Sequence, residues 1–184
     1  MTRQWIRSTA VALLLPLLPA TLSAQTYLFL GGGGTFPSGS YGDYAETGWL
    51  ASGGAGFYVG PEGMSVVVEG FYGQNNHKDL SQGVDEKTNP YGVMAEVLYE
   101  FGTGGKVRPY LLGGAGLLVH KFGTNQSYGG ASESQFGYTA GAGVSIPAGK
   151  TLNIYGEGRY FGSSDTQFFG VLAGVSLTLG GGGD

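Results

Sequence analysis

The sequence predicts an all-β fold: an eight-stranded antiparallel up-and-down transmembrane β-barrel that follows a cleaved signal peptide. Segments of about ten residues with alternating apolar side chains recur along the chain. The connections between these segments alternate between long polar stretches and short turns. Charged residues make up 12% of the chain, whereas about 25% is ordinary for a soluble domain. These features favour strands that cross a membrane over a soluble β-sandwich.

The first 24 residues are predicted to be a signal peptide. Two arginines precede an apolar stretch, Ala10–Leu18, and a small residue, Ala24, precedes Gln25. A membrane anchor is the alternative, but two prolines interrupt the apolar run, which is too short to span a bilayer. We therefore expect a signal peptide over residues 1–24, cleavage between Ala24 and Gln25, and one exported domain over residues 25–184.

Eight segments of the exported domain have strand-like patterns, and none has a clear helical period. The expected strands are Thr26–Phe36, Gly48–Val59, Met64–Gly73, Pro90–Phe101, Val107–Phe122, Gln135–Ile146, Thr151–Gly162 and Gln167–Leu179. Long connections cover residues 37–47, 74–89 and 123–134, with 163–166 as a shorter member, and short turns cover 60–63, 102–106 and 147–150. An up-and-down barrel places all the long connections at one end, which is extracellular in outer-membrane barrels.

Charged side chains in mid-strand, and a pair beside one short turn, share the face that we assign to the barrel interior. They are Glu69, Glu96, Glu100, Glu157, Arg108 and Arg159. The opposite face is apolar, as expected for lipid contact, where an Arg or Lys costs about 2–4 kcal/mol at the midplane. Glu100 and Arg108 lie across the turn at 102–106. We expect a structural charge network, because an unpaired buried charge is costly. A gated pore or proton path is the alternative.

Aromatic residues gather toward the strand ends, which predicts two bands at the membrane–water interfaces. The band near the long connections comprises Trp49, Phe71, Tyr72, Tyr91, Phe122, Phe136, Tyr138, Tyr160 and Phe169, and the band near the short turns comprises Tyr27, Phe57, Tyr58, Tyr99, Phe101 and Tyr110. Side chains just fill the interior of an eight-stranded barrel. Glycines at interior positions are expected to make room for larger neighbours; they are Gly54, Gly56, Gly114, Gly116, Gly141 and Gly143.

Three stretches carry a resemblance to a known family: Val107–Gly116, Gly156–Tyr160 and the final strand. In their order and spacing they resemble the small outer-membrane β-barrel proteins, a group similar to the outer membrane protein A transmembrane domain and the opacity-type proteins. The resemblance covers Thr26–Leu179. It implies a bacterial outer-membrane location, contact with outer-membrane lipids and lipopolysaccharide, and a charge network that plugs the barrel.

The resemblance also implies folding by the barrel assembly machinery, which reads a pattern in the last strand. Gly174, Leu177 and Leu179 match that pattern. Two departures concern its end: a leucine stands where the family usually has an aromatic residue, and residues 180–184 extend beyond it.

Several other function classes find little support in the sequence. Gly149-Lys150-Thr151 ends like a phosphate-binding loop, but Val144 stands where its first glycine belongs and a strand follows instead of a helix. A net charge of −4 gives no sign of the basic surface that nucleic-acid binding requires. The absence of cysteine excludes thiolate metal sites. We expect no catalytic, cofactor-binding or metal-binding residue.

The expected function is therefore a non-enzymatic envelope role, structural or by surface contact through long extracellular loops. Candidate loop contacts are Tyr41, Tyr44, His77, Lys78 and Tyr128. A small gated channel, a soluble secreted β-protein and a lipid A-modifying outer-membrane enzyme are the alternatives. The last uses a histidine with a serine close by, and neither His77 nor His120 is followed by such a serine.

Overall fold

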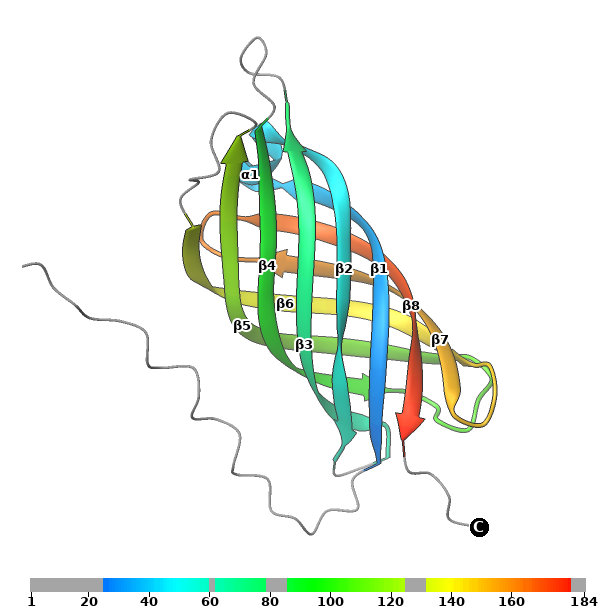
Figure 1. Cartoon of the computed structure of the whole chain (residues 1–184). Coiled ribbons are helices and arrows are strands. Elements are labelled where there is room, and N and C mark those ends of the chain that lie inside the picture. The colour runs from blue at the N-terminus through cyan, green and yellow to red at the C-terminus, as the bar shows by residue number, and fades with distance from the viewer. Residues whose placement is uncertain (1–24, 60–61, 79–85, 125–131, 180–184) are drawn as a thin grey trace, which may run out of the picture.

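A computed structural model describes residues 25–59, 62–78, 86–124 and 132–179. Eight antiparallel strands form a closed barrel in chain order, and the last strand pairs with the first (Figure 1). The strands are β1 (Thr26–Ser38), β2 (Ala45–Tyr58), β3 (Met64–His77), β4 (Glu86–Glu100), β5 (Arg108–Thr124), β6 (Ser132–Pro147), β7 (Leu152–Gly162) and β8 (Gln167–Leu179). The predicted fold is confirmed. The expected signal peptide lies outside the described residues.

One short helix, α1 (Gly39–Tyr44), joins β1 to β2 at the upper end of the barrel in Figure 1. We call this end, where β3, β5 and β7 also finish, the loop end. The opposite end, where β1 begins and β8 finishes, is the terminal end. The sequence did not predict α1, because a helix of six residues is too short to display a 3.6-residue period. Within the described ranges, no helix is long and apolar enough to cross a membrane.

The strands at the loop end are longer than the sequence indicated. β3 continues to His77, β4 begins at Glu86, and β6 begins at Ser132, so residues predicted as loops belong to the sheet. The expected long connections at 37–47, 74–89 and 123–134 were therefore too wide. The reason is physical: backbone pairing continues above the apolar band, where side chains no longer need to alternate.

The predicted inward and outward faces are confirmed along β3, β4, β7 and β8. In β8, for example, Phe168 and Leu172 are buried inside the barrel, whereas Val171 and Val175 are exposed on its outside. Large apolar side chains remain exposed all around the outer surface, including Leu30 at 67%. Such a surface is suited to lipid rather than water.

The aromatic prediction was correct only in part. Outward rings are exposed at the loop end, where the ring centroids of Trp49 and Tyr72 lie 5.8 Å apart. Four residues assigned to the bands face the interior of the barrel instead: Tyr27, Phe71 and Tyr110 are buried there, and Tyr58 is half-buried in the lumen. Their positions in the strand alternation place them on the inner face, and this decides their direction more firmly than nearness to a strand end. The side chain of Phe122 lies outside the described residues.

Candidate functional site

The candidate site is the barrel lumen, where four predicted charged residues meet. Arg159 on β7 reaches across to β3 and β4, and its Nη1 donates to Glu69 and, at 3.0 Å, to Glu96. Its Nη2 lies 2.7 Å from Oε1 of Glu157, two residues earlier on the same strand. All four side chains are at most 4% exposed. We call these residues the charge cluster.

Two aromatic residues contact the charge cluster. The hydroxyl of Tyr110, on β5, donates to Oε2 of Glu157 at 2.8 Å. The Arg159 guanidinium carbon lies 5.5 Å from the ring centroid of Phe161. Both contacts stabilise charged groups that have left water, through a charge-assisted hydrogen bond and a cation–π interaction. Sequence analysis missed both residues; the alternation of β5 and β7, which places them on the face of Arg108 and Arg159, could have found them.

Glu100 and Arg108 form the second predicted pair, separate from the charge cluster. Arg108 Nη1 lies 3.4 Å from Glu100 Oε1, and the Arg108 side chain is 27% exposed at the terminal end. The six predicted residues therefore form one buried cluster and one partly exposed pair, rather than a single network.

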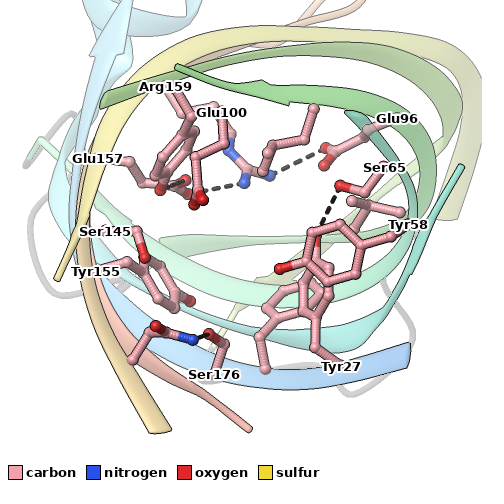
Figure 2. Close-up of a pocket in the computed structure, with 15 residues that line it drawn as sticks. Tyr27, Tyr58, Ser65, Glu96, Glu100, Ser145, Tyr155, Glu157, Arg159 and Ser176 are labelled. Atoms are coloured by element: carbon pink, nitrogen blue, oxygen red, sulfur yellow. Dashed lines mark hydrogen bonds and ion pairs between the residues drawn. The ribbon is translucent and has the colours of Figure 1, made fainter. Parts of the chain in front are cut away.

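A cavity of about 60 Å³ fills the lumen between the charge cluster and the terminal end. Four tyrosines, three serines and Asn153 line it, and its charged lining residues are Glu96, Glu100, Glu157 and Arg159 (Figure 2). A water molecule needs roughly 10–15 Å³ of such volume. The cavity can therefore hold several water molecules, but it is small for an organic ligand.

The inward tyrosines of this cavity lie over glycines on the neighbouring strand. Tyr27 is paired in register with Gly56, and Tyr110 with Gly143. A Cβ atom at either glycine would overlap the tyrosine ring. These two predicted space-making glycines are confirmed in that role, because each leaves room on the neighbouring strand for an inward ring in a narrow barrel.

Apolar side chains close the lumen above the charge cluster, toward the loop end. The buried set comprises Tyr41, Ala45, Leu50, Phe71, Met94, Leu118, Phe161, Phe168 and Leu172. The rings of Phe71 and Phe168 flank Phe161 at centroid distances of 5.1 and 4.9 Å. We call this set the apolar plug.

The residues predicted as loop contacts differ in their exposure to solvent. Tyr41 is fully buried under α1, so its assignment as a surface contact was wrong, and burial raises the pKa of its phenol. Tyr44 is half-buried against the ring of His77. Lys78 is exposed and donates to the Gly42 carbonyl at the end of α1, at 2.7 Å. Tyr128 lies outside the described residues.

The two histidines lie in different surroundings. His120 is buried inside the barrel, whereas His77 contacts Thr88 Oγ1 at 2.7 Å. Among the described residues, no group of three histidines and carboxylates could hold a metal ion. Glu69 and Glu96 share one arginine donor, Arg159 Nη1.

Comparison with known proteins agrees with this architecture. Residues 9–178 match the family model described as outer membrane protein beta-barrel domain. No curated protein sequence matches the chain. Among solved structures, Neisserial surface protein A is similar over 84% of this chain and 97% of that chain, with 20% identity and a TM-score of 0.62.

Two further structures have the same fold. A major outer membrane protein of Thermus thermophilus covers 86% of this chain and matches over 100% of its own, with 12% identity and a TM-score of 0.60. The attachment invasion locus protein Ail of Yersinia pestis, in complex with the heparin analogue sucrose octasulfate, has the same coverage, 14% identity and a TM-score of 0.55. The chain belongs to the outer membrane protein β-barrel domain family and is a protein of the bacterial outer membrane.

Proposed function

We propose that this protein is a non-enzymatic, closed barrel that stabilises the outer membrane and presents its loop end for contact with surfaces or partners. The observation that carries the proposal is the obstruction of the lumen at two successive levels, the charge cluster and the apolar plug. The role of the charge cluster in this proposal is structural.

A channel would need a continuous aqueous path through the barrel. Arg159 instead joins opposite walls, β7 to β3 and β4, through two ion pairs, and forms a third with Glu157 on its own strand. Above it, Phe161, Phe168 and Leu118 are fully buried. The small cavity therefore ends at the charge cluster and does not continue through the barrel. This supports a closed lumen rather than a pore.

The positions of the histidines support a non-enzymatic role. An enzyme that modifies membrane lipid must present its reactive groups to the lipid or to a cleft open to it. His120 faces the interior of the barrel and is 2% exposed. Incubation of the purified protein with lipid A, followed by mass spectrometry, tests this part: the lipid mass should stay unchanged.

The shape of the loop end supports surface contact. β3 and β4 continue several residues beyond the outward rings of Tyr72 and Tyr91, and α1 covers the mouth of the barrel. The protein therefore projects a rigid rim above the level of the aromatic band, whose rings mark the membrane interface. One structural neighbour with such a barrel is an attachment protein by name.

Planar-bilayer conductance tests the closed lumen. Wild-type protein should show no steady conductance, and Arg159→Ala should lose stability without conducting, because the apolar plug remains. Arg108→Ala, at the partly exposed Glu100–Arg108 pair, is the matched control. A steady conductance in wild type, or one in Arg159→Ala only, would favour the gated channel.

Exchange of connection 125–131 for a Gly-Ser linker of equal length separates the structural role from the contact role. Cells lacking the protein should be more sensitive to detergent, and both wild type and the exchanged variant should restore resistance. Retention of cells on heparin-coated and uncoated surfaces should depend on the connection. A variant exchanged at 102–106, at the terminal end, provides the control. Equal retention of all strains would argue against a contact role.

A further inference from the structure

Two lysines occupy the outer face of neighbouring strands at the loop end. Lys87 lies on β4 and Lys121 on β5, and both are exposed. Asn89 is the register partner of Lys121, and Lys87 lies two residues before Asn89 on the same face. Such diagonal neighbours are about 7–8 Å apart. Lys87, which the sequence assigned to a connection, and Lys121, which lay inside an expected strand, are therefore neighbours on the sheet.

The height of this pair is set by the aromatic rings below it. Tyr91 faces outward two residues beyond Asn89, and its ring stacks on Tyr72 at a centroid distance of 6.4 Å. At about 3.4 Å per residue and a tilt of about 40°, Lys121 lies roughly 5 Å above Tyr91 and Lys87 roughly 10 Å above it. Aromatic rings in this position sit at the headgroup level.

The same two strands offer an apolar track directly below. Val93 and Leu117 are register partners and point outward, with 56% and 61% of their surfaces exposed. The outer face of the β4–β5 strand pair therefore presents, from the loop end downward, two ammonium groups, an aromatic ring and an aliphatic pair. That order matches a phosphorylated lipid, from headgroup to acyl chains.

The charge of the pair is uncompensated in the described part of the chain. Neither Lys87 nor Lys121 has an ion-pair partner among the described residues. Among the side chains that the structure describes, the exposed acidic ones at this end belong to α1, β2 and connection 163–166; they are Asp43, Glu46 and Asp165. The third lysine at this end, Lys78, is engaged with the carbonyls of α1.

Asn89, the register partner of Lys121, is held in place on the β3 side of this pair. Its amide nitrogen donates to the hydroxyl of Tyr72 at 2.7 Å, which joins β4 to the aromatic band on β3 just below the lysines. The site is thus built on paired strands and one oriented amide.

We infer that Lys87 and Lys121 clamp a phosphate group of lipopolysaccharide in the outer leaflet, with its acyl chains against Val93 and Leu117. A phosphate accepts hydrogen bonds from both ammonium groups and neutralises them. The inference rests on the proposed orientation, with the loop end outside, but not on the closed lumen. It assigns a lipid-binding site to the outer face of β4 and β5. The family relationship, by contrast, implies only general contact with the membrane.

Binding of lipopolysaccharide to the purified full-length barrel in neutral detergent tests the site. The variant is Lys87→Gln with Lys121→Gln, and the matched control is Lys106→Gln with Lys150→Gln, which removes the same charge from the terminal end. Wild type and control should bind alike. The Lys87/Lys121 variant should bind about 10- to 30-fold more weakly, because each lysine near a lipid surface contributes about 1 kcal/mol. Lys87→Arg with Lys121→Arg should retain binding.

Three results would overturn the assignment. Equal binding by the Lys87/Lys121 variant and the control would show that these lysines do not bind lipopolysaccharide. If wild type binds dephosphorylated lipopolysaccharide as tightly as the phosphorylated form, the phosphate is not the group that is bound. Equal, lysine-dependent binding of phosphatidylglycerol vesicles would make the site a general anionic-lipid contact. The unheated gel mobility of each variant verifies that it is folded.

Orientation is tested separately from the lipid site. The chain has no cysteine, so Lys87→Cys introduces a single reactive thiol. A membrane-impermeant maleimide should label it on intact cells, whereas Lys150→Cys should be labelled only after lysis. The reverse pattern would overturn the orientation and the lipid site together, whereas steady conductance of wild type would overturn only the closed lumen.

Discussion

Arg159 is the only cation in contact with three buried carboxylates, Glu69, Glu96 and Glu157, within the part of the chain that the structure describes. Replacement by alanine leaves their charges without a partner in a narrow lumen. We expect Arg159→Ala to lower the free energy of unfolding by about 3–5 kcal/mol. Urea titration, followed by the fluorescence of Trp49 and by unheated gel mobility, measures the loss.

The Glu100–Arg108 pair provides the comparison for this prediction. It is partly exposed and its atoms are 3.4 Å apart, so Glu100→Gln should change stability by less than about 1 kcal/mol. Similar losses for both variants would mean that the charge cluster has no special role in stability.

Gly143 tests whether a glycine is needed under an inward ring. A Cβ there would overlap the Tyr110 ring and lie 2.7 Å from the Gly156 carbonyl oxygen. Gly143→Ala should therefore destabilise the barrel by about 1–3 kcal/mol, the usual cost of overpacking. Gly149, in the turn between β6 and β7, has no atom within 4 Å of such a Cβ, so Gly149→Ala should be nearly neutral in the same urea titration. Equal effects at both positions would contradict the packing argument.

At the residue scale, the sequence predicted the charged residues but not their contacts. Glu69, Glu96, Glu157 and Arg159 were identified because charges avoid the lipid face. Tyr110 was placed in an outer aromatic band, yet it donates to Glu157 inside the barrel. Which residues meet depends on strand register and barrel closure, which join β7 to β3 and β5 across the lumen.

At the scale of elements, α1 closes the loop end through a single buried side chain. Tyr41 is fully buried, whereas Asp43, on the same helix, is exposed. Tyr41→Ala should detach α1 from the barrel. The free energy that holds α1 in place should fall by about 3–5 kcal/mol, as for the loss of other large buried rings. Hydrogen exchange of residues 39–44 should rise, with the strands unchanged. Asp43→Ala should leave exchange as in wild type, and protection that survives Tyr41→Ala would show that α1 is held otherwise.

The strand ends show why element boundaries could not be predicted. Residues 74–77 and 86–89 are polar, and polarity suggested a loop. They nevertheless extend the β3–β4 ladder, which includes the register pairs Asn75–Thr88 and Asn76–Lys87. Backbone hydrogen bonds do not require apolar side chains, so the ladder continues where the hydrophobic alternation stops. This extension is what places Lys87 on the sheet.

At the scale of the whole molecule, closure predicts resistance to detergent. Every strand has two neighbours, so the barrel has no free edge at which unfolding can begin. Unheated protein from outer-membrane fractions should migrate differently from boiled protein on a dodecyl sulfate gel. Identical migration, together with recovery in a soluble fraction, would contradict the transmembrane barrel.

Export predicts the start of the mature chain. Cleavage after Ala24 would leave Gln25 as the first residue, and its carbonyl accepts a hydrogen bond from Tyr58 N at 3.1 Å. The intact mass of the protein extracted from outer membranes should correspond to residues 25–184. A mass that includes residues 1–24 would mean that the signal peptide is retained as an anchor.

The sequence by itself determined the barrel and its two faces, because lipid and a narrow lumen impose opposite demands on alternate residues. Only the tertiary structure decided what the interior and the rim contain. It joined Arg159 to carboxylates on opposite strands, turned Tyr27 and Tyr110 inward over glycines, and set Lys87 beside Lys121. These relations depend on register and closure, which bring distant residues together and leave no local pattern in the chain.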